Sequence, residues 1–289
     1  FKTDNIEEHL KFEGRSHIAT AKFTHALART KSLNTDAFVS FDYKQIQNFG
    51  AGMQSSFDKL RVLTGAFSCD YIDNWKGRNL FLASAGWGIP DLLGGLKPVS
   101  QESSRVGSGG RYIKFNGSYK RLQKLPSDSM FIFSITGQYS LDKLPLPEQL
   151  YLGGPETIRG FRLGKGLGDL GFYGTLELRV PPPFIREMRV PWMKKRWGEF
   201  LHFVGFVDHG QTFSIGQDKI REIVENPQNE YEEAAVPVKR KTYLTSAGMG
   251  IRVYGPWKFE VSCDIAYPLS EDLHFSNQDV YLRIALKVL

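Results

Sequence analysis

The chain has 289 residues, of which 41% are hydrophobic and 24% are charged. That length allows one or two ordinary domains or one large β structure, and 13% aromatic residues together with 29 glycines favour β structure. The net charge of +6 is small for this length, and the densest basic clusters fall in predicted turns, so no nucleic-acid partner is predicted.

The sequence contains no apolar run near the roughly 18 residues that a membrane-spanning helix needs, which excludes spanning by helices and nothing more. Cys69 and Cys263 are far apart, and each lies in an alternating segment. We interpret both as small apolar residues and predict no disulfide. Because the chain starts at Phe1 without a signal peptide, we expect that processing or truncation removed its natural start.

Segment after segment alternates apolar and polar side chains, which is the pattern of β-strands with one apolar and one polar face. In 172–180, for example, Leu176 and Leu178 lie on one face and Glu177 on the other. The only helix-like piece is 217–225, within a polar loop. The predicted strands, about eleven in number, are residues 17–28, 36–46, 60–72, 79–89, 111–122, 130–139, 172–180, 199–213, 242–254, 257–267 and 280–288.

Strands of this kind occur in soluble sandwiches or barrels and in outer-membrane barrels. Charged residues fall repeatedly on one face, and the chain ends on an alternating strand, as barrel closure requires. The connections alternate between short and long, as periplasmic turns and outer loops do. Short links are 29–35, 73–78, 123–128 and Gly255-Pro256; long ones are 47–58, 90–110, 140–171, 214–241 and 268–279.

These features predict an all-β fold, specifically a transmembrane antiparallel β-barrel. One connection, 181–198, is long for a periplasmic turn. Eleven is also an odd number, whereas bacterial single-chain barrels have an even count and leave no open edge in lipid. We therefore expect residues 1–289 to be the C-terminal part of an outer-membrane β-barrel domain that has further strands at its N-terminal side.

The most informative connection is 140–171, which counting back from the last strand places on the outer side of the membrane. It is rich in glycine and contains one arginine within Ile158-Arg159-Gly160-Phe161. Glycines in a loop cost conformational entropy without adding core, so a specific role is indicated.

The segment 158–161 resembles the loop motif of the Omp85 superfamily. Its context is similar to the TpsB transporters of two-partner secretion, the haemolysin-activator type. The segments that carry this narrower resemblance are 138–154, 168–171, 206–210 and 266–269. The resemblance covers most of residues 15–289.

This resemblance implies a pore in the bacterial outer membrane that passes a secreted, TpsA-like partner protein. It also implies a lipid bilayer and the outer-membrane assembly machinery as partners. About eleven of the sixteen strands of the family barrel would be present, and the periplasmic POTRA domains are absent from this sequence. The motif loop would fold back into the lumen, where its arginine contacts acids on the barrel wall.

The strand phases provide an independent check, because Glu177 and Asp208 both fall on the polar, lumen-facing side of their strands. Arg159 offers donors in a rigid fork that suits carboxylates. We predict that Arg159 pairs with Asp208, with Glu177 assisting. Gly153, Gly154 and Gly160 would let the loop approach the wall, beside Ile158 and Phe161. The alternative interpretation is that Arg159, Asp208 and Glu177 belong to a row of solvated charges on the lumen wall, as found in any porin.

No catalytic, cofactor or metal site is predicted, and no enzyme activity. His202 and His209 could bind a metal ion only with a third protein ligand, and the sequence indicates none beside them. The glycine pattern in 166–171 formally matches a dinucleotide fingerprint, but it opens onto a strand and provides no helix N-terminus for a pyrophosphate.

Three functions stay open at this point. The first is export of a partner protein. The second is an Omp85-type factor that assembles other outer-membrane proteins; two POTRA domains upstream would favour export and about five would favour assembly. The third is a passive porin, which has no need of the motif in 158–161.

Overall fold

A computed structural model describes residues 12–50, 53–193, 195–216, 219–225, 231–237, 241–255, 259–270 and 281–288. Its regular structure is almost entirely β. The strands are β1 (Phe12–Arg29), β2 (Leu33–Gly50), β3 (Met53–Ile72), β4 (Arg78–Gly88), β5 (Tyr112–Lys124), β6 (Met130–Ser140), β7 (Leu150–Leu152), β8 (Gly166–Gly168), β9 (Leu170–Val180), β10 (Leu201–Phe213), β11 (Lys219–Glu225), β12 (Tyr231–Pro237), β13 (Lys241–Tyr254), β14 (Phe259–Pro268) and β15 (Tyr281–Val288).

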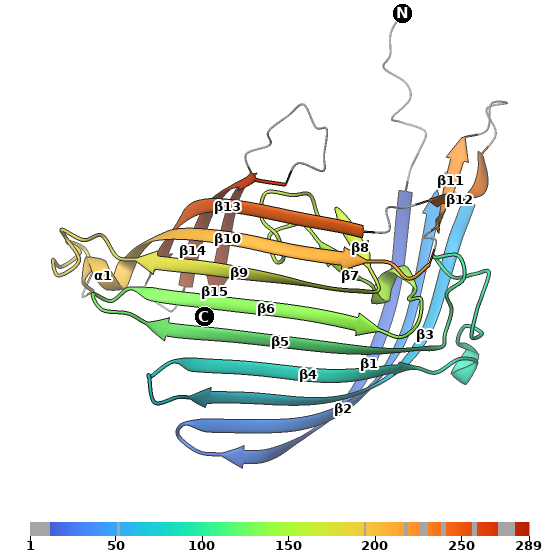
Figure 1. Ribbon diagram of the computed structural model, residues 1–289, viewed down its shortest axis with the longest axis horizontal. Coiled ribbons are helices and arrows are strands. Elements are labelled where there is room, and N and C mark those ends of the chain that lie inside the picture. The colour runs from blue at the N-terminus through green and yellow to red at the C-terminus, as the bar shows by residue number, and fades with distance from the viewer. Residues whose placement is uncertain are drawn as a thin grey trace, which may run out of the picture.

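Eleven of these strands form one sheet in the order β1-β2-β3-β4-β5-β6-β9-β10-β13-β14-β15. Every neighbouring pair is antiparallel, and the sheet is strongly curved (Figure 1). These eleven strands coincide with the eleven predicted ones, so the all-β antiparallel fold is confirmed. Within the described residues, β1 and β15 each pair with one neighbour.

Two local predictions were wrong. The connection 47–58 is not a long loop, because β2 and β3 pair as far as Gly50↔Met53 and leave only residues 51–52 between them. Backbone hydrogen bonding between the two strands continues through most of this segment. The helix-like piece at 217–225 contains a strand, β11, which pairs with β12. A short periodic segment does not distinguish helix from strand.

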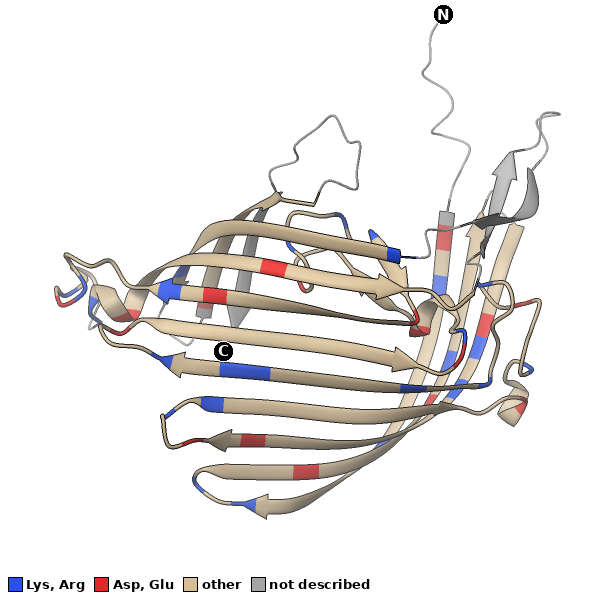
Figure 2. Cartoon of the chain, in the orientation of Figure 1, with Lys and Arg blue, Asp and Glu red and all other residues tan. Residues whose placement is uncertain are grey.

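The two faces of the sheet differ as the alternation predicts. The outer face carries exposed apolar side chains, such as Ile135 on β6 and Leu176 on β9. The inner face carries buried polar ones, including Gln138, Glu177 and Asp208. Figure 2 shows that β6 carries no charged residue and that the charges of β13 lie near its ends. An apolar outer face and a polar inner face are what a transmembrane barrel requires.

The helices of the described residues are few and short. They are the 3-10 helices η1 (Leu92–Gly94) and η2 (Leu146–Glu148) and the helix α1 (Trp197–Phe200) in the long link after β9. In the described part of the chain, no helix has the length and apolar character needed to cross a membrane. Cys69 and Cys263 are free.

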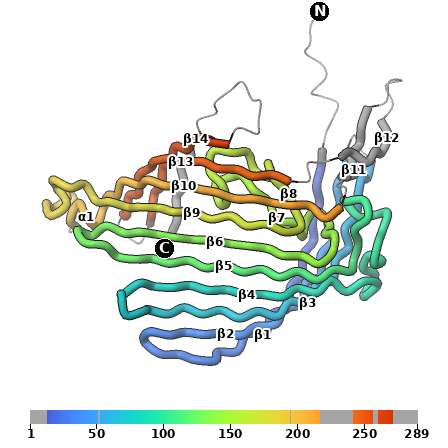
Figure 3. Tube along the Cα trace, viewed as in Figure 1, coloured from blue at the N-terminus to red at the C-terminus, as the bar shows by residue number. Residues whose placement is uncertain are grey.

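The connection between β6 and β9 positions the candidate site. Strands β7 and β8 pair within it, from Leu150↔Gly168 to Leu152↔Gly166. Figure 3 shows this connection returning alongside the sheet near β10 and β13, instead of pointing away from the strand ends. Its side chains consequently meet the inner face of the sheet.

Candidate functional site

The site is built on residues 150–168, which we call the motif hairpin. Its turn depends on glycine: Gly153, Gly154 and Gly160 have φ angles of 92°, 95° and 89°, in the left-handed region. A Cβ added at Gly153 would lie 2.1 Å from the carbonyl oxygen of Arg162. The hairpin therefore folds tightly because glycine occupies these positions.

Apolar contacts fix the hairpin on the inner face. Ile158 and Phe161 are buried in a cluster with Leu152 and with Leu244 of β13. Gly160 lies against the backbone and side chain of Ala266, so that a Cβ at residue 160 would be 3.3 Å from the Ala266 Cβ. These contacts bring the residue between them, Arg159, against the wall.

Arg159 and Asp208 form a bidentate ion pair. Nε of Arg159 donates to Oδ2 of Asp208 at 2.8 Å, and Nη2 donates to Oδ1 at 2.9 Å. The backbone N–H of Arg159 also donates to Oδ2, at 3.1 Å. Asp208 is fully buried and Arg159 is 7% exposed. Paired geometry of this kind is the strongest form of carboxylate recognition by arginine.

Three other wall residues complete the surroundings of Arg159. Its Nη1 donates to Oε2 of Glu177 at 3.2 Å and lies 3.6 Å from Oδ2 of Asp264. The guanidinium carbon lies 3.3 Å from the ring centroid of Phe206, which places the cation over the aromatic face. Strands β9, β10 and β14 thus each contribute to one arginine.

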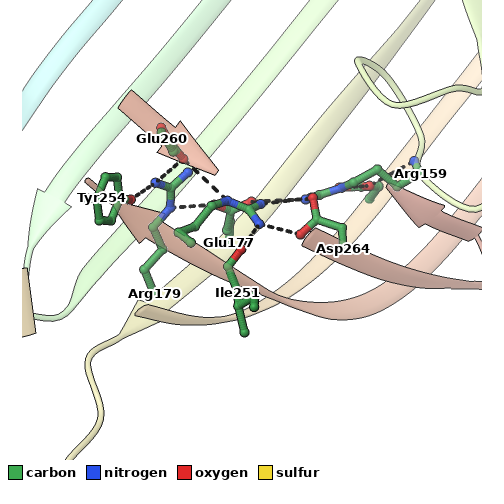
Figure 4. A network of polar contacts seen from close by, with 9 residues as sticks. Arg159, Glu177, Arg179, Ile251, Tyr254, Glu260 and Asp264 are labelled. Atoms are coloured by element: carbon green, nitrogen blue, oxygen red, sulfur yellow. Dashed lines mark hydrogen bonds and ion pairs between the residues drawn. The ribbon is translucent and has the colours of Figure 1, made fainter. Parts of the chain in front are cut away.

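The acids around Arg159 belong to a longer network on the inner face (Figure 4). Arg252 binds both oxygens of Asp264, at 2.6 and 3.1 Å, and Arg179 donates to Oε1 of Glu177 at 2.7 Å. Arg179 also donates to the hydroxyl of Tyr254 at 2.5 Å, and Glu260 lies within 3.7 Å of both Arg179 and Arg252. Three arginines here face four carboxylates.

The structure brings together all the residues predicted for the site. Glu177 and Asp208 meet Arg159, and Ile158 and Phe161 pack beside it. Four further residues of the site were not predicted from the sequence, namely Asp264, Arg252, Arg179 and Phe206. The signal for Asp264 was available, since it lies on the polar phase of 257–267. In the described residues, no group of three or more potential metal ligands occurs.

Comparison with known proteins identifies the family. Residues 2–214 match the family model described as haemolysin secretion/activation protein ShlB/FhaC/HecB. The chain belongs to this family. The predicted family membership is therefore confirmed, as are the β-barrel fold class and location in the bacterial outer membrane.

A curated relative is similar to most of this chain. The heme/hemopexin transporter protein HuxB of Haemophilus influenzae is 21% identical over 284 residues, covering 96% of this chain and 45% of HuxB. The chain thus spans somewhat less than half the length of this curated relative.

Solved structures show the same fold. CdiB from Escherichia coli superposes with a TM-score of 0.68 at 17% identity, covering 98% of this chain and 46% of CdiB. CdiB from Acinetobacter baumannii gives 0.62 at 17% identity, covering 95% of this chain and 42% of that one. BamA from Haemophilus ducreyi gives 0.58 at 12% identity, covering 96% and 55%.

Proposed function

We propose that the chain forms part of an outer-membrane pore for two-partner secretion, which exports a TpsA-like partner protein through its lumen. In this proposal the motif hairpin is an inward-folded plug, and the pair of Arg159 with Asp208 keeps it in place. Transport makes and breaks no covalent bond, so the proposal includes no enzyme activity. The lipid bilayer surrounds the outer face, and the outer-membrane assembly machinery inserts the protein.

One observation carries the proposal: a connection that follows a strand end returns along the inner face and places a buried arginine on a buried wall carboxylate. A purely structural loop has no need to bury an ion pair, since buried charges are costly to desolvate and add little net stability. A plug must be held in place and later released, and a buried ion pair between the plug and the wall can serve both purposes.

We further propose that the eleven strands close into a barrel together with N-terminal strands and POTRA domains of the same protein. In the described residues β1 and β15 each pair with one strand only, which supports this, because an unpaired edge in lipid costs several kcal/mol for each unsatisfied backbone group.

The test uses the whole transporter carrying Arg159→Ala, with Arg162→Ala as the matched control in the same hairpin. We expect Arg159→Ala to raise the planar-bilayer conductance and to reduce secretion of the partner, while Arg162→Ala changes neither. Unchanged conductance and secretion in Arg159→Ala would favour a passive porin.

The likeness to BamA supports a second candidate, a factor that assembles other outer-membrane proteins. Deleting the gene distinguishes the two. Export predicts that the partner accumulates inside the cell while other outer-membrane proteins keep their levels. Assembly predicts that several unrelated outer-membrane proteins decrease together.

A further inference from the structure

The motif hairpin is held at its two ends as well as at Arg159. Glu148 lies two residues before β7 and is buried. Its Oε1 accepts from Nζ of Lys44 on β2, and its Oε2 lies 2.7 Å from Nζ of Lys114 on β5. Each carboxylate oxygen thus has its own ammonium group.

The other end of the hairpin is held by Asp169, directly after β8. Nη1 and Nη2 of Arg105 donate to its two oxygens at 2.5 and 2.9 Å, and both side chains are fully buried. The backbone N–H groups of Leu144 and Ile215 donate to the same carboxylate at 2.8 and 2.7 Å. Asp169 therefore joins three connections: the one after β4, the motif connection, and the one after β10.

Between these ends the hairpin is internally braced. Strands β7 and β8 pair, the N–H of Gly154 donates to the carbonyl of Phe161, and the hydroxyl of Thr157 donates to the carbonyl of Gly153. Such bonds favour motion of the hairpin as a unit over unravelling of its tip.

The charges at the ends and at the tip have opposite sign. At the ends the hairpin side is acidic and its partners are Lys44, Lys114 and Arg105. At the tip the hairpin side is basic, and its partners are Asp208, Glu177 and Asp264. Reversing or sliding the hairpin would place like charges together, and such contacts are a strong source of specificity.

We propose that Arg105, Lys44 and Lys114 are positioning residues that keep the two ends of the hairpin fixed when Arg159 leaves Asp208. The hairpin then turns about Glu148 and Asp169 and returns to the same wall site. This inference rests on the proposed plug function. It also gives the connection after β4 a role in the pore, because that connection carries Arg105.

The test measures distances between spin labels in the whole transporter, reconstituted in bilayers, with Cys69 and Cys263 replaced by serine. Each label is attached to a cysteine introduced at one of three exposed positions. These positions are Leu93 after β4, which is the reference, Tyr151 near the end of the hairpin, and Leu163 near its tip. Asp208→Asn provides the released state. We expect the 93–163 distance distribution to shift and broaden by several ångström while the 93–151 distribution keeps its position and width.

Adding Arg105→Ala to Asp208→Asn should broaden the 93–151 distribution as well. Arg105→Lys, which keeps the charge, should restore most of its width. Arg111→Ala is the matched control, because Arg111 is an exposed arginine of the same connection. If Arg105→Ala prevents folding, Asp169→Asn and the Lys44→Met, Lys114→Met pair test the same ends.

Two outcomes would overturn the inference. In one, Asp208→Asn alone moves the 93–151 distance as much as the 93–163 distance, so that the ends are not fixed. In the other, Arg105→Ala leaves both distributions as they are in Asp208→Asn. Because these distances are read without any cargo, they stay informative if the secretion assay refutes the proposed function.

Discussion

Among the acids that bind Arg159, Asp208 contributes most to keeping Arg159 in place. In the described part of the chain, the hydrogen bonds of the Asp208 carboxylate all come from Arg159. Glu177 and Asp264 differ, because Arg179 and Arg252 respectively remain bound to them when Arg159 leaves. Release of the hairpin thus leaves one buried carboxylate without a cation.

This asymmetry predicts unequal effects of two neutral substitutions. Asp208→Asn should increase pore conductance strongly, since removing one partner of a buried ion pair costs about 3–5 kcal/mol. Glu177→Gln should have a smaller effect, because the bidentate pair remains. Glu102→Gln, in an exposed pair with Lys59, is the control and should change conductance little. An effect of Glu177→Gln equal to or larger than that of Asp208→Asn would refute the ranking.

The exchange of charges between Arg159 and Asp208 should rescue only part of the function. In Arg159→Asp with Asp208→Arg the ionic attraction returns, but the backbone N–H of residue 159 loses its acceptor and the cation no longer covers Phe206. We expect the double variant to secrete more partner than either single variant and less than the wild type. If the double variant secretes no better than the singles, the pair is not what holds the hairpin.

Strand phase was enough to predict that Asp208 and Glu177 lie on the inner face, because side chains along a strand point alternately to its two faces. Strand phase also places Asp264 on the inner face, but it could not predict that Arg252 pairs with it. Their contact depends on the register of β13 against β14, in which Gly250 lies opposite Asp264 and Arg252 opposite Ser262. Register follows from pairing between strands and cannot be read from either strand alone.

At the scale of the hairpin, backbone conformation is as important as charge. Gly153→Ala introduces a Cβ at a φ of 92° and 2.1 Å from the carbonyl of Arg162, so the turn must change. We expect the same increase in conductance as in Arg159→Ala, although no charge is altered. Gly117→Ala on β5 is the control, since no atom lies within 4 Å of its added Cβ. Equal conductance of the two alanine variants would contradict the role of the turn.

The N-terminal end of the hairpin should respond to acid. Burial raises the pKa of Glu148, but the positive charges of Lys114 and Lys44 lower it by more than burial raises it. The pKa of Glu148 therefore lies below its ordinary value of 4.5. A carboxyl group with a lowered pKa stabilises the folded state above its ordinary pKa, and this stabilisation is lost as the pH falls through the lowered value. The hairpin end should therefore loosen only below pH 4.5.

Glu148→Gln isolates this effect from the titration of other acids. In bilayer recordings, wild-type conductance fluctuations should increase as the pH falls below 4.5, and the variant should show frequent fluctuations already at neutral pH. If the variant and the wild type have the same pH profile, Glu148 does not hold the hairpin end.

For the whole molecule, alternation along the chain predicted all eleven strands of the main sheet, because each strand needs one apolar and one polar face. The same alternation was a weaker guide to where the strands end. Residues 47–58 are predicted to be a long connection, yet most of them extend β2 and β3. Backbone pairing continues there because each strand satisfies the hydrogen bonds of the other, whatever their side chains.

The assignment of the two faces makes a prediction for the entire barrel, which adjacent residues of β6 can test. Ile135 is exposed on the outer face, whereas Ser134 lies on the inner face. Ile135→Arg places a charge in lipid at a cost of about 2–4 kcal/mol near the bilayer midplane, whereas Ser134→Arg places the same charge in a polar lumen. Denaturant unfolding of the whole protein in lipid vesicles should show a lower free energy of unfolding for Ile135→Arg only. Equal destabilisation by both substitutions would mean that the lumen at this depth is closed to water, and a larger loss for Ser134→Arg would reverse the assignment of the faces.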